Sequence, residues 1–324
     1  MILSEDLFLS IKEDINQLNI NLKKMVGSKH PVLYAAAKHL LQQGGKRIRP
    51  SIILLIAKII TKNNIILSEH KRLAEITEII HTASLMHDDV IDDCDTRRGL
   101  NTVHSVFSTK IAILAGDFLF AQSSWYLANL NNLEVVKTIS KVIIDFAEGE
   151  TRQGITTFDA SISIDDYIDK SFYKTATLIA CSCKATVMLS NLNKDMENNF
   201  YLYGKHLGLA FQIVDDILDI ISEKNKLGKP AGSDLKNGNF TAPVIFALQE
   251  KPELYKLINQ EFQNDNDLNK AINIIKNTKG IQKAKDLAEE HIQLAIEIIR
   301  EMLSIYDNNE SLILISDYVL NRLN

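Results

Sequence analysis

Two acidic segments hold the side chains of this sequence that are best suited to chemistry. Both have the pattern DDxxD, and their aspartates are Asp88, Asp89 and Asp92 in the first segment and Asp215, Asp216 and Asp219 in the second. On a helix, the first and last aspartates of such a segment lie at positions i and i+4, on one face and about 6 Å apart. Like charges at this spacing repel each other, so we expect a bound cation to offset them.

The residue types around the two segments favour Mg²⁺ and phosphate oxygens. Carboxylates without a neighbouring set of Cys or His suit Mg²⁺, which usually takes one or two protein carboxylates and fills its other positions with water or phosphate. Basic residues close in sequence are Arg97, Arg98, Lys229 and those of the stretch GGKRIRP at residues 44–50. The sequence therefore predicts a site for two diphosphates, one bridged by metal and one held by Lys and Arg.

A solvated helix face is the simpler interpretation of either acidic segment alone, because acidic pairs are common on helices. Two segments that each follow an apolar run and precede bases favour a binding site instead. Taken alone, the basic stretch at 46–49 is typical of a solvated turn and His81 of a buried core histidine. His81 precedes Asp88 by two helical turns, so it would share the face of that aspartate.

The elements that position these residues are predicted to be helices. Apolar residues recur at three- and four-residue steps, and only 5 Pro and 13 Gly are spread over 324 residues. Ser163 is the expected N-cap of a helix through Tyr167 and Lys174. Loops or surface turns are expected at residues 44–45, 228–238 and 263–270. We predict one all-α domain over residues 1–324.

Composition and charge argue against several other classes. A net charge of −5 gives no basic footprint for nucleic acid. Cys94, Cys181 and Cys183 lack metal-finger spacing, so we expect thiols in a reducing compartment. The first residues have acids where a secretory signal needs bases, and the most apolar stretch, residues 51–60, is about half a bilayer span. We therefore expect a soluble protein without a stable membrane anchor.

Seven segments, in one order along nearly the whole chain, resemble those of the trans-isoprenyl diphosphate synthases, the polyprenyl synthetase family. They are GGKRIRP (44–50), HTASLMHDDVIDD (81–93) with the following RRG (97–99), GDFLF (116–120), EGETRQ (148–153), YKTATLIA (173–180), GLAFQIVDDILD (208–219) and GKPAGSDL (228–235). The resemblance implies an isoprenoid-synthase helical bundle around a central cleft, with the two acidic segments facing each other across it. It also implies a homodimer with a cleft in each subunit.

The resemblance further implies a reaction and a role for each matching residue. Family members condense an allylic diphosphate with isopentenyl diphosphate, adding five-carbon trans units with the help of two or three Mg²⁺ per subunit. The implied metal ligands are Asp88, Asp92 and Asp215, and the implied cations beside the allylic diphosphate are Arg97 and Lys229. The residues that match the isopentenyl diphosphate pocket are Lys46, Arg49, His81 and Arg98. Those expected to line the allylic head and the carbocation are Lys174, Thr175 and Gln212.

The resemblance also assigns the last proton transfer, for which the released diphosphate is the expected base. Without the family, Lys174 and Thr175 would be interpreted as a helix surface pair and Gln212 as a core polar group. One residue departs from the family pattern. Asn239, five residues after Asp234, stands where many members have Lys, which removes one diphosphate contact.

Product length is expected to depend on Ala83 and Ser84. Short-chain family members have a bulky aromatic that plugs the product tunnel four or five residues before the first aspartate, and both residues here are small. One helical turn is about 5.4 Å, close to one extended isoprene unit, so each missing plug admits roughly one more unit. We predict an octaprenyl or nonaprenyl product, with close helix packing as the alternative reason for small residues here.

Other functions remain open at the level of the sequence. They are a geranylgeranyl diphosphate synthase for carotenoids, a non-catalytic subunit of a heteromeric synthase, a terpene cyclase and a helical scaffold protein. The segment DYVLNRLN at residues 317–324 resembles cyanobacterial and plastid family members. We therefore expect an organelle-encoded protein of the plastid stroma or a bacterial cytoplasmic one, with its product used for a prenylquinone side chain.

Overall fold

A computed structural model describes residues 8–27, 30–42, 44–97, 99–221, 232–262, 264–303 and 310–323. The chain divides into two compact units. The first unit comprises Met1–Val142, Leu178–Gly204 and Ile298–Ile315, and the second comprises Ile143–Thr177, Lys205–Glu297 and Ser316–Asn324. The all-α class is confirmed, since the described residues are helical apart from connections and one pair of two-residue strands.

The first unit is built around α5, a helix of 24 residues. Its elements are α2 (Lys12–Met25), α3 (Pro31–Gln42), α4 (Ile48–Ile60), the 3₁₀ turn η1 (Lys62–Asn64), α5 (Ser68–Ile91), β1 (Thr96–Arg97), β2 (Leu100–Asn101), α6 (Val103–Val106) and α7 (Thr109–Ala128). Parts of α8 (Leu133–Ile155), α10 (Thr177–Leu189), α11 (Lys194–Ile221), α17 (Gly280–Leu303) and α18 (Glu310–Asn321) complete it. The antiparallel strands β1 and β2 follow directly after α5.

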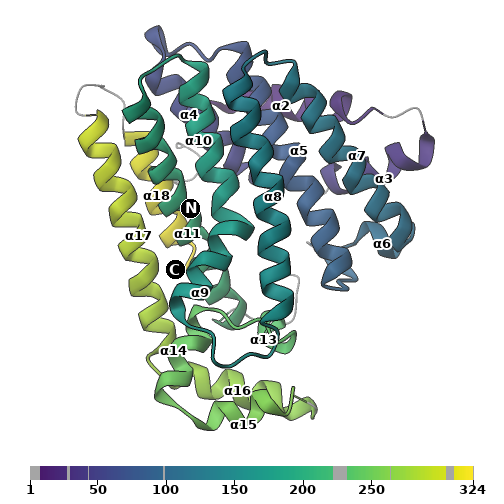
Figure 1. Ribbon diagram of the computed structural model, residues 1–324, viewed down its shortest axis with the longest axis vertical. Helices are drawn as coiled ribbons and strands as arrows, with labels where there is room; N and C mark the ends of the chain where they lie inside the picture. Colours follow the sequence, from purple (N-terminus) through teal and green to yellow (C-terminus); the bar gives the residue numbers. More distant parts are fainter. Residues whose placement is uncertain are drawn as a thin grey trace. The chain divides into compact units, whose positions relative to one another are not determined.

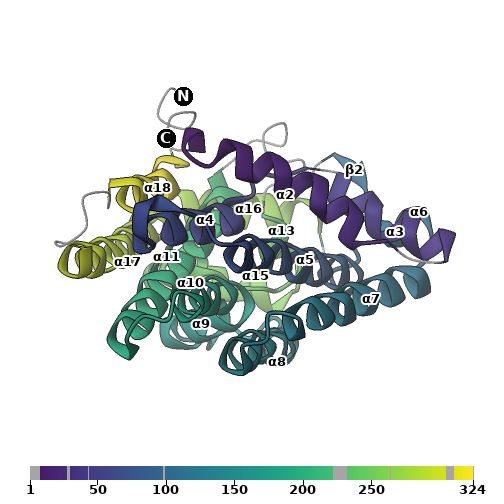
Figure 2. The same cartoon turned by 90° about the horizontal axis from the view of Figure 1, so that it is seen from above.

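Buried apolar faces hold α5 in place. Its residues Leu73, Ile76, Ile79 and Ile80 are at most 1% exposed, which is the three- and four-residue spacing seen in the sequence. The helices α5 and α7 lie side by side, in both views (Figures 1 and 2). The predicted apolar stretch at 51–60 lies in α4, which is buried at nearly every position.

A glycine lets α7 approach α5 next to the first acidic segment. A Cβ on Gly116 would lie 2.2 Å from His87 Nε2, so any side chain here would collide with that imidazole. The imidazole Nε2 lies 3.1 Å from the Ile113 carbonyl oxygen and 3.6 Å from an Asp117 carboxylate oxygen. The GDFLF segment thus fixes the histidine that immediately precedes Asp88.

The second unit carries α9 and the later helices. Its own elements are α9 (Ile164–Ser171), the π-helix η2 (Phe172–Ala176), α13 (Ser233–Lys236), α14 (Ala242–Glu250), α15 (Glu253–Asn259) and α16 (Asp265–Lys276), and it shares α8, α10, α11, α17 and α18 with the first unit. The predicted N-cap is confirmed: Ser163 and Asp166 form a reciprocal capping box. The helix begun there changes to π-helical hydrogen bonding at Phe172.

Two sequence-based expectations of irregular structure are wrong. The segment 263–270 was expected to be a surface turn, but α16 begins at Asp265. Ala271, Ile272 and Ile275, which follow the segment in α16, are buried and give this helix an apolar face. Tertiary packing of the helix therefore outweighs the Asn-rich composition at its start. The expected loop at 228–238 contains the short helix α13 in its described part.

Candidate functional site

The first acidic segment lies at the C-terminal end of α5. The helix ends at Ile91, Asp92 is its C-cap, and the last turn has no basic residue. Carboxylates at this position are repelled by the negative C-terminal end of the helix dipole. A cation from outside the helix would relieve this repulsion. Asp88 and Asp92 are half-buried, whereas Asp89 is only 2% exposed.

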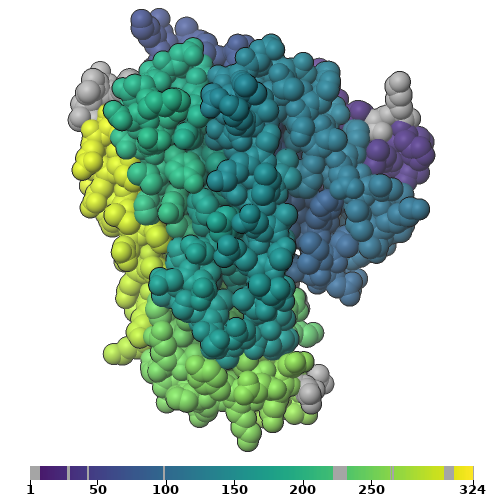
Figure 3. Space-filling model, viewed as in Figure 1, coloured from purple at the N-terminus to yellow at the C-terminus, as the bar shows by residue number. Residues whose placement is uncertain are grey.

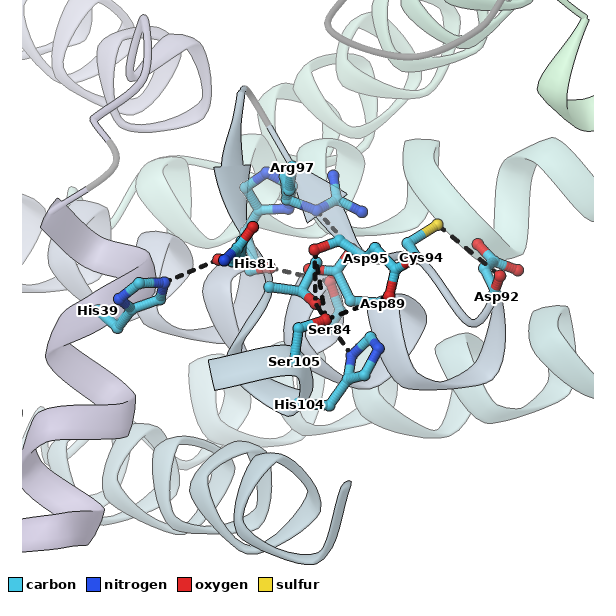
Figure 4. Close-up of polar contacts among 12 residues, drawn as sticks. His39, His81, Ser84, Asp89, Asp92, Cys94, Asp95, Arg97, His104 and Ser105 are labelled. Carbon is cyan, nitrogen blue, oxygen red and sulfur yellow. Dashed lines mark hydrogen bonds and ion pairs between the residues drawn. The ribbon is translucent and has the colours of Figure 1, made fainter. Parts of the chain in front are cut away.

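The buried Asp89 has an internal cation. Arg97 lies on β1, and its Nε donates a hydrogen bond to Asp89 Oδ1 at 2.7 Å (Figure 4). The strand pair after α5 therefore turns the chain back so that the guanidinium reaches the helix end. On the other side of the turn, Cys94 Sγ lies 3.8 Å from the Asp92 carbonyl oxygen. Arg97 was expected beside the allylic diphosphate, and the structure shows it paired with Asp89; Arg98 lies outside the described residues.

The basic stretch before α4 sends its side chains in different directions. Lys46 is exposed, while the neighbouring Arg47 is half-buried and forms an ion pair with Glu78. Arg47 Nε also donates to Asn19 Oδ1 at 3.1 Å. Arg47 thus fixes this stretch against α5. The sequence did not predict this role, because residue type alone does not distinguish Arg47 from the neighbouring Lys46 and Arg49.

The structure brings together two of the residues expected in the isopentenyl diphosphate pocket. Arg49 Nη1 lies 3.1 Å from His81 Nε2. A guanidinium has only donors, so Nε2 accepts and the imidazole carries its proton on Nδ1. Two residues further along α5, Ala83 is fully buried, and Ser84 is half-buried with its hydroxyl donating to the His81 carbonyl oxygen at 3.0 Å.

In the second unit, a π-helix presents Lys174 and Thr175. A π turn shifts the side chains that follow it relative to an α-helix and occurs frequently at functional sites. Lys174 Nζ lies 2.8 Å from Glu150 Oε1 and 3.0 Å from Gln153 Oε1 on α8. Glu150 belongs to the EGETRQ segment, whose role as the acidic partner of this lysine is visible only in the structure.

A chain of hydrogen bonds joins the π-helix to the second acidic segment. The Thr175 hydroxyl donates to Gln212 Oε1 at 2.6 Å, and Gln212 Nε2 donates to Asp216 Oδ1 at 2.7 Å. Gly208 permits this approach, because a Cβ there would lie 2.7 Å from the Ala176 Cα. The predicted neighbours Thr175 and Gln212 are therefore in direct contact.

The three aspartates of the second segment have different surroundings. Asp216 is buried, and burial together with the charge of Asp234 raises the pKa of its carboxyl well above the usual range. Asp219 accepts a hydrogen bond from the Ser233 hydroxyl at 3.0 Å, and burial and Asp234 raise its pKa to about 6. Asp215 is 39% exposed and forms an ion pair with Arg322 at 2.5 Å.

The second acidic segment also terminates a helix without compensating bases. It occupies the last two turns of α11, whose last turn contains no basic residue. Lys229, the expected cation, lies outside the described residues. Two residues that the sequence did not single out belong to this site: Tyr167, which donates to Asp216, and Arg322.

The departure at Asn239 has a structural counterpart. Lys170 is buried, and its Nζ donates to Asn239 Oδ1 at 2.5 Å and to the Phe240 carbonyl oxygen at 3.5 Å. Its ammonium also lies 6.0 Å from the Tyr167 ring centroid. Burial lowers the pKa of Lys170, while Asp216 and Asp234 oppose that effect. A lysine from α9 therefore supplies positive charge beside Asn239.

The donor sets fit a hard divalent cation. Both acidic segments are helix ends rich in carboxylate oxygen and free of bases in the last turn. In the part of the chain that the structure describes, no three His, Cys, Asp or Glu side chains gather closely enough to hold a metal by themselves. Mg²⁺ commonly takes only one or two protein carboxylates, with phosphate oxygens among its other ligands.

An all-helical scaffold with two such helix ends fits a metal-dependent enzyme that acts on diphosphates. The chain belongs to the polyprenyl synthetase family, whose model matches residues 30–275. It is 60% identical over 296 residues to a prenyl transferase of Porphyra purpurea, covering 91% of this chain and 92% of the relative. It is 49% identical over 296 residues to chloroplastic solanesyl diphosphate synthase 2 of Arabidopsis thaliana, covering 90% of this chain and 71% of the relative.

Solved structures show the same fold. The heptaprenyl diphosphate synthase of Staphylococcus aureus superposes with a TM-score of 0.91 at 31% identity, over 97% of this chain and 99% of that one. The polyprenyl synthase of Caulobacter crescentus, complexed with calcium and isoprenyl diphosphate, superposes with a TM-score of 0.90 at 28% identity, over 98% and 97% of the two chains. The protein is therefore a prenyl-transferring enzyme of a family that uses divalent metal ions and isoprenyl diphosphates.

Proposed function

We propose that the protein is a long-chain all-trans polyprenyl diphosphate synthase with an octaprenyl or nonaprenyl product. The observation that carries this proposal is the small residue pair before Asp88 on α5, where Ala83 is fully buried and Ser84 is half-buried. A tunnel that passes this point meets no bulky side chain from these positions. The solanesyl-type relatives support the same product class.

Each acidic segment has a proposed metal role. Asp88 and Asp92 on α5 and Asp215 on α11 would hold two or three Mg²⁺. Bound Mg²⁺ would neutralise the negative charge that develops on the leaving diphosphate. Asp89 and Asp216 are proposed to support the metal ligands rather than to bind metal. Arg97 already pairs with the Asp89 carboxylate. Tyr167 and Gln212 each donate a hydrogen bond to the Asp216 carboxylate. We also retain Arg97 and Lys229 as proposed cations for the allylic diphosphate.

The remaining residues bind the co-substrate and protect the carbocation. Lys46, Arg49, His81 and Arg98 would bind the diphosphate of isopentenyl diphosphate. Thr175 and Gln212 hold their dipoles fixed through their mutual hydrogen bond, so little reorganisation is needed when positive charge develops on the allylic carbon. Lys174 would contact the allylic diphosphate while Glu150 orients it. The departing diphosphate would take the final proton.

Product analysis tests this function. The purified protein is incubated with Mg²⁺, isopentenyl diphosphate and either farnesyl or geranylgeranyl diphosphate, and the products are separated by chromatography. Products of about 40 to 45 carbons support the proposal, as eight or nine five-carbon units. Products that stop at twenty carbons indicate a geranylgeranyl diphosphate synthase, cyclised hydrocarbon indicates a cyclase, and no turnover indicates a non-catalytic subunit or scaffold.

A matched pair of variants links turnover to the acidic segment. Asp215→Asn should abolish most of the Mg²⁺-dependent turnover, because it removes a proposed metal ligand. Asp195→Asn removes an exposed carboxylate from the first turn of the same helix and should leave turnover unchanged. Equal activity of the two variants would contradict the metal role of Asp215.

We further propose a homodimer that uses the outer face of α7. This helix is long and apolar enough to cross a membrane by length and composition, and 33% of its most apolar window is buried within the protein. Its exposed apolar residues are Ile113 (42%), Leu114 (47%) and Trp125 (61%). Blue atoms of this part of the chain lie on the face shown in Figure 3. A second copy would cover a face that one chain leaves in water.

The mass of the protein in solution tests the dimer. Trp125→Glu should convert dimer to monomer in size-exclusion chromatography with light scattering. Ile65→Glu, at another exposed apolar position (57%), should not. A monomeric wild-type protein that floats with phospholipid vesicles would instead assign α7 to a membrane surface.

The relatives also support a cellular setting. Relatives at 49–60% identity come from Synechocystis, from the alga Porphyra purpurea and, as a chloroplastic enzyme, from Arabidopsis thaliana. We propose that the protein works in the plastid stroma or in a bacterial cytoplasm of this lineage and that its product becomes a prenylquinone side chain. Loss of the prenylquinone, with carotenoids retained, in a deletion strain would support this use.

A further inference from the structure

Arg322 forms an ion pair with Asp215, the aspartate of the second acidic segment whose side chain is 39% exposed. It follows α18, and its Nη2 lies 2.5 Å from Asp215 Oδ1. Its guanidinium carbon lies 4.6 Å from the centroid of the Phe211 ring. Phe211 and Asp215 are four residues apart on α11 and so share one face. An aromatic ring and a carboxylate on adjacent turns therefore hold the arginine together.

This arrangement competes with metal binding at Asp215. Mg²⁺ lies about 2.0–2.1 Å from its oxygen ligands, and a guanidinium on the same carboxylate would then place two cations within a few ångströms of each other. A metal ion that binds Asp215 Oδ1 would therefore compete with Arg322 for the same oxygen. The stacking on Phe211 is independent of the ion pair, so the displaced guanidinium would stay near this face.

The displaced arginine has donors available for an anion. Its Nη1 is buried and has no hydrogen-bond partner among the described residues. Guanidinium groups bind phosphate oxygens through paired N–H donors. A diphosphate that arrives with the metal would give Arg322 a new anionic partner, whereas Mg²⁺ alone would leave it without one.

We propose that Arg322 is a positioning residue that couples the binding of metal and diphosphate at the second acidic segment. It holds Asp215 in the metal-free protein and releases it when Mg²⁺ and diphosphate bind together. This inference rests on the proposed metal role of Asp215. The protein should therefore bind Mg²⁺ more weakly in the absence of diphosphate than in its presence.

Titration calorimetry and thermal unfolding test the coupling without any turnover. The probes are MgCl₂ alone, inorganic diphosphate alone and both together, added to the wild-type protein and to Arg322→Met. The variant should bind Mg²⁺ alone about two- to fivefold more tightly, the range expected for losing a partly exposed competing ion pair. Diphosphate should then strengthen Mg²⁺ binding by a smaller factor in the variant than in the wild type.

Two further variants keep the test decisive. Arg300→Met removes an exposed arginine of α17 and should bind Mg²⁺ as the wild type does. Phe211→Leu keeps the ion pair but removes the stacking, so it should shift Mg²⁺ affinity in the same direction as Arg322→Met and by less. Phe211→Leu also serves if Arg322→Met does not fold. Unchanged or weaker Mg²⁺ binding in both variants would overturn the coupling.

Failure of this inference is distinguishable from failure of the proposed function. If Asp215→Asn weakens Mg²⁺ binding but Arg322→Met leaves it unchanged, Asp215 is a metal ligand and Arg322 does not compete for it. If Asp215→Asn binds Mg²⁺ as the wild type does, the metal role of Asp215 is wrong, and the coupling is wrong with it.

Discussion

The Tyr167 hydroxyl donates a hydrogen bond to Asp216 Oδ2 at 2.6 Å, between two buried side chains on α9 and α11. The Arg97–Asp89 ion pair in the first segment likewise engages a buried carboxylate, through a guanidinium instead of a hydroxyl. In each acidic segment, the second aspartate is buried and engaged by the protein, and the neighbouring carboxylates are more accessible. The pattern DDxxD thus contains one supporting aspartate and others that can face a ligand.

Tyr167→Phe should lower the free energy of unfolding by about 1–3 kcal/mol, since it removes one of the donors to a buried carboxyl. The loss should grow as pH rises, because the hydroxyl stabilises the ionised form of Asp216 and without it the pKa of that carboxyl rises further. Urea unfolding between pH 5 and 9 measures both effects.

Tyr203→Phe is the matched control for that experiment. Tyr203 is also buried, and its hydroxyl donates to the Leu312 carbonyl oxygen at 3.2 Å, a group that does not titrate. The loss of unfolding free energy in Tyr203→Phe should be the same at every pH. A pH-independent cost for Tyr167→Phe would show that Asp216 stays in one protonation state over this range.

Ala83→Phe should shorten the product, because the ring would project from α5 where the growing chain is proposed to pass. Some overpacking is expected as well, at about 1–3 kcal/mol of stability. Chromatography of the products after a fixed total incorporation of isopentenyl diphosphate measures length separately from rate. Ala295→Phe, at a fully buried position of α17, should lose stability but retain product length. Unchanged length in Ala83→Phe would contradict the open tunnel.

Asn239→Lys should destabilise the protein by about 1–3 kcal/mol, since it places a second ammonium against the buried Lys170. The double variant Asn239→Lys with Lys170→Met should recover part of that loss, because a single ammonium remains. The urea midpoints of the wild type, the two single variants and the double variant form a complete cycle. Strictly additive effects would mean that the two positions do not share one charge site.

His206 and His291 should make the protein less stable as pH falls. Their Nδ1 atoms lie 3.0 Å apart, and burial, with the nearby charge of Lys205, lowers the pKa of each to about 4. An unfolded histidine titrates near about 6.5, so the unfolded state binds more protons between these values. The stability contributed by the neutral pair is therefore complete above about pH 6.5 and is lost as pH falls towards 4.

The variant His206→Gln checks this sign. It should flatten the pH dependence of the unfolding free energy between pH 6.5 and 4, relative to the wild type. His30→Gln, which changes an exposed histidine of the first unit, should leave that slope unchanged. A slope in His206→Gln as steep as in the wild type would assign the loss to groups other than this histidine pair.

Local sequence patterns predicted the helices well where the apolar period was clear. The α5 core positions and the Ser163 cap follow from spacing and from the chemistry of a single side chain. The same approach failed at residues 263–270, where composition suggested a turn and the buried face of α16 imposed a helix. It also did not predict the π-helix that begins at Phe172 and ends at Ala176, where Gly208 of α11 packs closely.

The sequence by itself determined the helical class, the family and the two acidic segments, because each of these depends on residue type and on distances of a few residues along the chain. Only the tertiary structure decided which charges meet. Arg97 reaches Asp89, Lys170 reaches Asn239 and Arg322 reaches Asp215 because strands, turns and helix packing bring residues 8, 69 and 107 positions apart into contact. Coulomb and hydrogen-bond energies depend on separation in space, and separation along the chain does not set it.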